Sequence, residues 1–383
     1  MGALSGFKII ELTGLGPCPM AGMLLADMGA EVICIDRSTE LPDLNQKDMS
    51  RRGKKSMVID LKKPEGRELL LQLVAKADAL IEGFRPGVTE RLGIGPEECL
   101  AVNPKLVYGR MTGWGQTGPL ALRAGHDINY ISLNGALASV GPAGQKPVVP
   151  VNLVGDFGGG AMFLVTGVLA ALLEAQKSGK GQVVDAAMVE GAANLMWMCH
   201  SYHAVNLWDM TKRGTNLLDG AAFFYDTYET ADGRYVAIGA IEPQFFTALV
   251  EKAGLDPARF NLEDQMNEAL WPELKAELAA VMRTKTRDQW CALLDGSDAC
   301  FTPVLDAVEA PDHPHNQARH NYLEIDGYLQ PAPAPRFSRT PSVVRHGLHQ
   351  PGVDNDAVLA EFGFSAGDIN ALSEAGVIQK YQG

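Results

Sequence analysis

Short apolar runs alternate with amphipathic stretches through the first half of the chain. The apolar runs are rich in Ile, Val and Leu, which predicts buried strands. They lie at 7–12, 31–36, 56–61, 79–84, 106–115 and 182–188. Apolar residues at helical spacing predict helices at 20–29, 65–77 and 188–208. Strands that alternate with helices in this way indicate an α/β fold with a Rossmann-like parallel sheet.

The second half of the chain has a different pattern. Residues 223–241 predict an antiparallel hairpin with Asp232 and Gly233 at its turn. Short helices follow at 245–255, 271–285 and 287–296, and a last one is predicted at 354–364. The proline-rich stretch 311–341 predicts a long extended linker between them.

These patterns predict two domains. We expect a large Rossmann-like domain from 1–200 and 325–383, and a small α+β domain from 225–315. The segments 201–224 and 316–324 are expected to be the linkers.

Charge and cysteine usage narrow the class of protein. The formal net charge of -13 argues against a nucleic-acid partner, because phosphate backbones require a basic face. Six scattered cysteines without a CxxC pair are typical of reduced thiols, so we expect a cytoplasmic protein. The apolar run 157–173 is short for a membrane span and rich in glycine, which favours a buried helix and no membrane partner.

The stretch "ELTGLGPCPMAG", residues 11–22, imitates a dinucleotide fingerprint, and Asp36 ends the next predicted strand. The third glycine of that fingerprint is missing. Pro17 and Pro19 also remove two backbone N–H groups from the loop that would hold the phosphates. The stretch therefore supports a parallel sheet and disfavours a bound dinucleotide.

Two polar residues stand just before apolar helical patterns. His126 lies in "GHDINYISLNG", where it is either a working base or a histidine that opens a helix. Asp156 lies in "NLVGDFGGG", where an aspartate is often no more than a helix N-cap. The residues alone leave both alternatives open.

Several ordered blocks resemble the family III CoA-transferase superfamily and, within it, the 2-methylacyl-CoA racemases. The blocks include "GLGPCPMAGMLLADMGAEVICIDR", "RRGKKSMVIDLK", "IEGFRPGVTERLGIG", "GRMTGWGQTGP", "GHDINYISLNG", "NLVGDFGGGAMFL", "SGKGQVVDAAMVEG" and "GAIEPQFF". The resemblance implies an interlocked homodimer in which the Rossmann-like domain is accompanied by the smaller α+β domain. It also implies an acyl-CoA thioester substrate and no cofactor, since CoA is part of the substrate.

The same resemblance assigns the catalytic residues. His126 and Asp156 are expected to carry protons to and from opposite faces of the carbon next to the thioester, and Glu242 to pair with the imidazole. The backbone N–H of Asp127 is expected to stabilise an enolate oxygen, and Asn152 to orient a carboxylate or hold substrate. In the transferases of the superfamily the aspartate is instead an acyl nucleophile, which is the alternative function for Asp156.

Two departures from the transferases favour racemisation. The transferases usually carry a tyrosine where this chain has His126, and a glycine-rich loop where it reads "GAIEPQ". An aspartate that returns a proton also needs a raised pKa, which burial would provide and a neighbouring helix terminus would oppose.

The expected CoA-binding residues are Arg37, Arg52, Lys62, Gly83 and Arg85. The resemblance places the four cations near the adenosine and phosphates, where charge-assisted hydrogen bonds are strong, and the glycine near the pantetheine. An exposed basic loop remains the alternative for each cation. His313 and His315 are not accompanied by a ligand cluster, so no metal is expected.

Overall fold

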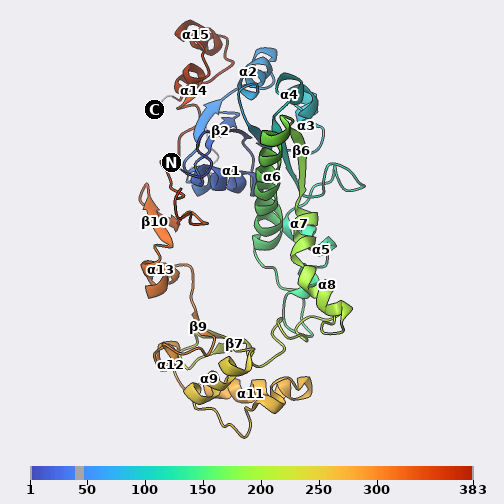
Figure 1. Cartoon of the computed structure of the whole chain (residues 1–383), viewed down its shortest axis with the longest axis vertical. Helices are drawn as coiled ribbons and strands as arrows, with labels where there is room; N and C mark the ends of the chain where they lie inside the picture. Colours follow the sequence, from blue (N-terminus) through green and yellow to red (C-terminus); the bar gives the residue numbers. More distant parts are fainter. Residues whose placement is uncertain (1, 39–46, 382–383) are drawn as a thin grey trace. The chain divides into compact units, whose positions relative to one another are not determined.

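The structure is a computed structural model that describes residues 2–38 and 47–381. Its largest sheet has six parallel strands in the order β3-β2-β1-β4-β5-β6 (Figure 1). The strands are β1 (Lys8–Leu12), β2 (Glu31–Asp36), β3 (Lys55–Val58), β4 (Ala79–Glu82), β5 (Val107–Thr112) and β6 (Gln182–Ala187). The predicted Rossmann-like α/β architecture is therefore confirmed.

Helices cover both faces of this sheet. One face packs against α1 (Pro17–Asp27) and α6 (Met162–Ser178). The other packs against α2 (Pro64–Val74), α4 (Pro96–Val102), α14 (Asn355–Glu361) and α15 (Ala366–Glu374). The short helix α3 (Val88–Leu92) follows β4. The two termini of the chain thus contribute to a single layered unit.

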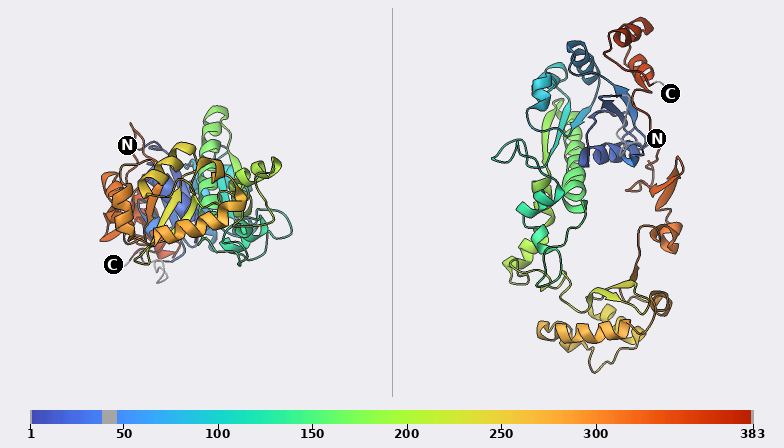
Figure 2. Two further views of the ribbon diagram at one scale, coloured as in Figure 1. Left: turned by 90° about the horizontal axis from the view of Figure 1, so that it is seen from below. Right: turned by 180° about the vertical axis from the view of Figure 1, so that it is seen from behind.

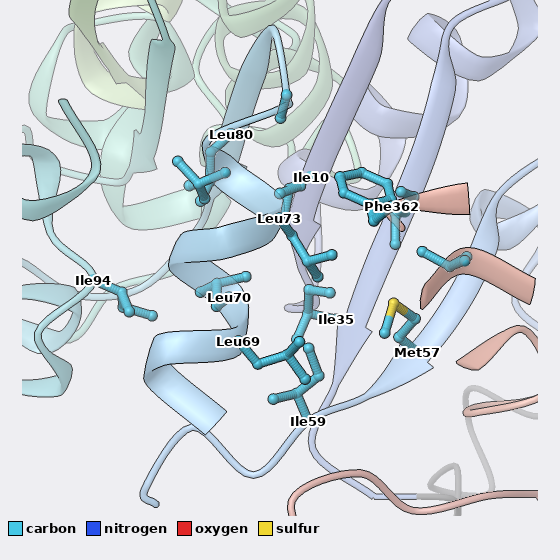
Figure 3. Packing of buried hydrophobic residues seen from close by; sticks show 14 of the residues in the cluster. Ile10, Ile35, Met57, Ile59, Leu69, Leu70, Leu73, Leu80, Ile94 and Phe362 are labelled. Atoms are coloured by element: carbon cyan, nitrogen blue, oxygen red, sulfur yellow. The ribbon is translucent and has the colours of Figure 1, made fainter. Parts of the chain in front are cut away.

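The second face shows why these segments assemble. Leu70 and Leu73 of α2 and Phe362 after α14 pack over Ile10 and Ile35 of the central strands (Figure 3). Full burial of such a side chain stabilises the fold by about 1.5–3 kcal/mol. The apolar runs of β1 to β5 are therefore apolar because this part of the sheet is covered on both sides.

A π-helix, Leu153–Ala161, runs directly into α6. Its N-cap is Asn152, so Asp156 lies within its first turns and the expected N-cap position of Asp156 is wrong. Together Leu153–Ser178 form an apolar helix whose mean hydropathy of 1.7 and length would suffice to cross a membrane. Leu164 and Val168 are nevertheless fully buried in the sheet-facing core, as expected for a core helix.

The π-helix lies unusually close to α7 (Met188–Leu195) because both elements present glycine at the contact. A Cβ at Gly191 would fall 1.8 Å from the carbonyl oxygen of Gly159. A Cβ at Gly159 would in turn fall 2.4 Å from the backbone nitrogen of Ala192. The position of the π-helix, and of Asp156 on it, therefore depends on these two glycines.

The chain divides into two compact units. Unit 1 is Met1–Asn134, Val151–Leu195 and His320–Gly383, and unit 2 is Gly135–Pro150 and Met196–Arg319. Unit 2 has an antiparallel sheet of β7 (Tyr225–Glu229), β8 (Tyr235–Gly239) and β9 (Phe301–Val304), drawn in yellow to orange in Figure 2. Its helices include α8 (Trp197–Ala204), α9 (Pro243–Ala253), α10 (Leu262–Gln265), α11 (Trp271–Met282) and α12 (Arg287–Leu294). The predicted hairpin at 223–241 is confirmed by β7 and β8.

Two predicted elements differ from the structure. The helix expected at 188–208 is interrupted at Met196, whose backbone (φ -85°, ψ 5°) leaves the helical region between α7 and α8. The extended linker expected at 311–341 contains α13 (Pro314–Ala318) and a hairpin of β10 (Tyr322–Ile325) and β11 (Tyr328–Pro331). Asp326 and Gly327, both at positive φ, form the two-residue turn that this dipeptide favours.

We predict that Gly191→Ala lowers the free energy of unfolding by about 1–3 kcal/mol, because the new methyl group must displace the π-helix backbone. Gly367→Ala in α15 is the matched control, since only the Ser365 hydroxyl lies near its Cβ, at 3.6 Å. This control should stay within about 0.5 kcal/mol of wild type. Urea unfolding of the full chain measures both, and equal stability of the two variants would contradict the close contact.

Candidate active site

A cavity of about 370 Å³ opens in unit 1 at the carboxyl ends of β1, β4 and β5. β1 and β4 are neighbours at the point where the strand order reverses, which is where open α/β sheets usually bind ligands. The lining includes Leu15, Gly16, Pro17, Gly83, Phe84, Arg85, Met111, Trp114, Arg123, His126, Tyr130, Asp156 and Met188. Four predicted site residues, His126, Asp156, Gly83 and Arg85, are thus brought to one cavity.

His126 is the N-cap residue of α5 (Asp127–Leu133) and is exposed to the cavity. Its backbone N–H donates to the side-chain oxygen of Asn129 over 3.0 Å, which fixes the entry into the helix. The His126 side chain is exposed and lines the cavity, so the imidazole is accessible to a ligand there.

Asp156 faces the same cavity from the π-helix and is half-buried. Its backbone N–H donates to Asp127 Oδ2 over 2.7 Å, and its Oδ2 accepts from Asn152 Nδ2 over 3.3 Å. Burial raises the pKa of the Asp156 carboxyl above its ordinary value, and the Asp127 charge raises it further, against the lowering effects of Asn152 and His126. The raised pKa expected for a proton-returning aspartate is confirmed in direction.

Asp127 contributes more than its backbone to this arrangement. Its side chain is buried, at 6% exposure, and its Oδ2 holds the π-helix as described. Its Oδ1 is also buried and has no hydrogen-bond partner among the described residues. The prediction considered only its N–H group, so the side chain is an addition to the site.

Tyr130 and Trp114 form a wall of the cavity that the sequence reasoning missed. Their rings meet edge to face, with centroids 4.7 Å apart. The Tyr130 hydroxyl donates to the carbonyl of Gly125, the residue before His126. The spacing of four residues from His126 to Tyr130 was the available signal, because such residues share one helix face.

The loop after β4 brings Gly83 and Arg85 to the cavity. Glu82, at the end of the strand, is fully buried and accepts from the Phe84 N–H over 2.7 Å and from Arg110 Nε over 2.9 Å. Burial raises the Glu82 pKa to about 7 in spite of both donors. This buried carboxyl anchors the loop that carries two of the predicted CoA-binding residues.

The remaining predicted cations are placed elsewhere. Arg37 and Lys62 are exposed and are not among the residues that line the cavity. Arg123 does line it and was missed, although it stands three residues before His126. Across the described residues, no group of three His, Cys, Asp or Glu side chains is arranged to hold a metal.

Arg52 requires a correction. It is 4% exposed, and its guanidinium donates to both carboxylate oxygens of Asp27, to Gln330 Oε1 and to the carbonyl of Pro331. A guanidinium desolvated in this way must be paired, so it holds the scaffold instead of meeting a CoA phosphate. The neighbouring Lys54 is likewise buried against Glu11, at 2.6 Å.

Glu242 belongs to unit 2, where it is the exposed N-cap residue of α9. Its charge contributes to raising the pKa of the Cys300 thiol, after the effect of burial. The pairing of Glu242 with His126, a residue of unit 1, stays a prediction.

The carboxyl of Asp156 and the imidazole of His126 line one cavity, at the point where the strand order of a Rossmann-type sheet reverses. This arrangement is typical of an enzyme active site. Residues 4–356 match the profile of CoA-transferase family III, and the chain belongs to this family. The mouse protein "Alpha-methylacyl-CoA racemase" is 44% identical over 379 residues, which cover 98% of this chain and 97% of that protein. The human protein of the same name is 42% identical over 380 residues, 98% of each chain.

A solved structure gives the same picture of the fold. The CAIB/BAIF family protein from Brucella suis superposes with a TM-score of 0.79 at 26% sequence identity, over 94% of this chain and 99% of that one.

We predict that Arg52→Ala lowers the stability of the fold, whereas Arg85→Ala weakens the binding of CoA. Arg52→Ala should cost about 3–5 kcal/mol of folding free energy, because it leaves Asp27 buried and unpaired. Arg85→Ala should leave stability unchanged and weaken CoA binding about tenfold, the loss of one hydrogen bond to a charged group.

Urea unfolding and calorimetric titration with CoA measure the two effects. Arg283→Ala, which removes an exposed pair with Glu229 in unit 2, is the control for both. Weaker CoA binding by Arg283→Ala, or unchanged binding by Arg85→Ala, would contradict the assignment of the cavity.

Proposed function

We propose that the protein is a racemase that inverts the 2-methyl centre of 2-methylacyl-CoA thioesters. The observation that carries the proposal is the shared cavity of His126 and Asp156, in a chain 44% identical to a protein named as a methylacyl-CoA racemase. Both groups exchange protons at moderate cost, and inversion requires one proton carrier on each side of the carbon.

The reaction proceeds through an enolate. In one direction neutral His126 removes the α-proton, the electron pair of the broken C–H bond moves onto the thioester oxygen, and protonated Asp156 returns a proton to the opposite face. In the other direction ionised Asp156 removes the proton and the imidazolium returns one. The raised pKa of Asp156 supports this exchange of roles, because it brings the carboxyl closer to an imidazole.

The developing oxyanion is proposed to lie at the start of α5. The N–H group of Asp127, the first residue of this helix, has no partner within the helix by position. One such donor in a preorganised site is worth about 2.7–4 kcal/mol of transition-state stabilisation. The short helix α5 thus provides both the base and the oxyanion donor.

Two further residues are proposed to orient the carriers. Asn152 holds the Asp156 carboxyl by the contact described above. Glu242 is proposed to accept from the imidazole of His126 and to fix its tautomer. The CoA portion of the substrate is proposed to bind to Gly83 and Arg85, with Arg37 and Lys62 as outer contacts. No separate cofactor is proposed, because CoA is part of the substrate.

We predict that His126→Asn and Asp156→Asn each slow racemisation strongly but retain proton exchange on one face of the carbon. Loss of one carrier should slow racemisation by about 10²–10⁴-fold. The carrier that remains should still exchange the α-proton of the one epimer whose hydrogen faces it. In deuterated water the two variants should therefore label opposite epimers, as mass spectrometry of each substrate measures.

The alternative, a CoA-transferase with Asp156 as nucleophile, gives a different result in the same experiment. A transferase leaves the α-proton in place without an acceptor acid, and hydroxylamine traps its acyl-aspartyl intermediate. Absence of α-proton exchange by wild type together with such trapping would replace the racemase proposal by the transferase.

We also propose a homodimer and a cytoplasmic setting. Trp197 and Leu207 are 68% and 67% exposed, which is unusual for large apolar side chains in neighbouring segments and supports a covered surface. All six cysteines are free thiols, which supports a reducing compartment.

Sedimentation should give twice the chain mass of 41.1 kDa for wild type. Trp197→Asp should shift the equilibrium toward monomer, because a charge cannot be buried unpaired at an interface. A monomeric wild type would contradict the dimer.

A further inference from the structure

The buried side chain of Asp127 is hydrogen-bonded to the backbone of Asp156, the residue that carries the proposed acid. Its Oδ2 accepts the backbone N–H of Asp156 at 2.7 Å. A Cβ at Gly155 would lie 2.4 Å from this same oxygen. The approach of a carboxylate to the backbone that carries Asp156 is thus built into the packing.

The charge of Asp127 is only partly compensated. Oδ1 is buried without a partner in the described part of the chain, and the carboxylate has no cation paired with it there. Its position in the first turn of α5 stabilises a negative charge through the helix dipole. A buried charge that is not paired acts strongly on ionisable neighbours, because little water screens it.

We propose that Asp127 is a positioning residue whose negative charge keeps Asp156 in its proton-donating form. The inference rests on the proposed racemase function, in which Asp156 must alternate between acid and base. It assigns to the Asp127 side chain a role separate from that of its N–H group.

The other side chains that influence the Asp156 carboxyl do not have this effect. Asn152 and His126 favour its ionised form, and the field of Asp127 is the one charge that raises the Asp156 pKa among the described residues. Tyr130 on α5 is influenced by Asp156, Arg85 and Asp127 but does not itself shift the Asp156 pKa.

The remaining elements packed against the π-helix also carry ionisable groups. They are Cys18 and Asp27 on α1, Tyr108 and Arg110 on β5, Asp185 on β6, Glu174 and Lys177 on α6, and Glu190 on α7. None of them contributes to the shift.

The expected kinetic effect follows from the single proton that the two carriers share. Without the Asp127 charge, the proton resides more on His126, which depletes the form with protonated Asp156. Ionised Asp156 becomes a weaker base to the same extent. Because the equilibrium between epimers is fixed, kcat/KM must fall by the same factor in both directions.

The test is Asp127→Asn, which removes the charge but retains an oxygen that accepts the Asp156 N–H. We expect kcat/KM for α-proton exchange to fall about tenfold in both directions, as for loss of a like charge at close range. The acid limb of the pH profile should move toward lower pH, because Asp156 then loses its proton more readily. Glu190→Gln, the same chemical change on an exposed residue of α7, should leave both the rate and the limb unchanged.

The possible outcomes separate the role of Asp127 from a structural one and from the proposed function. A slower variant whose acid limb stays at the wild-type pH would show that Asp127 only supports the fold, which overturns the inference. A melting temperature equal to wild type together with the shifted limb supports it. Absence of exchange in wild type would overturn the racemase proposal and this inference with it, whereas exchange with an unmoved limb overturns the inference alone.

Discussion

One hydrogen bond, from the Asp156 N–H to Asp127 Oδ2, organises the candidate site. It joins the first turn of α5 to the π-helix, two elements that come from separate stretches of the chain. His126 is the N-cap residue of α5, so this bond fixes the two proposed proton carriers on one cavity. Gly159 and Gly191 let the π-helix approach α7, and Gly155 lets it approach α5. These glycines therefore make the close contact possible. π-helical segments often occur at functional sites because they place a side chain where a regular helix would not.

The cations of the basic run at 51–55 stabilise the scaffold, whereas other cations of this acidic chain lie at the cavity. Arg51 pairs with Asp36 of β2, and the next cations reach acids on α1 and β1. The Gln330 contact also ties the C-terminal return of the chain to this cluster. Cations that are buried in this way organise the sheet and its helices. Arg85 and Arg123 stay exposed at the cavity, where we propose that they attract a phosphorylated ligand.

Much of the fold was predictable from the sequence, because periodicity reports burial. The strands of the large sheet and the hairpin of unit 2 follow directly from it. The π-helix and the break at Met196 were not predictable, since both depend on tertiary contacts between glycines and on backbone angles that apolar periodicity does not encode. The hairpin at 322–331 was missed although its Asp-Gly turn was visible, because proline content was given more weight. In the site, sequence motifs identified His126 and Asp156. The burial of Arg52 could not be inferred, because the sequence of a basic run is the same whether its cations are paired in the interior or exposed.

The central claim is that two proton carriers act on opposite faces of one carbon. Its most direct test is a single turnover of one pure epimer in deuterated water, with the isotope content of the α-carbon measured separately in product and in recovered substrate. Two carriers predict that the first product formed is fully deuterated, because the proton removed on one face is not the one returned on the other. Product that retains the original hydrogen would mean that a single group moves it across, and would contradict the account.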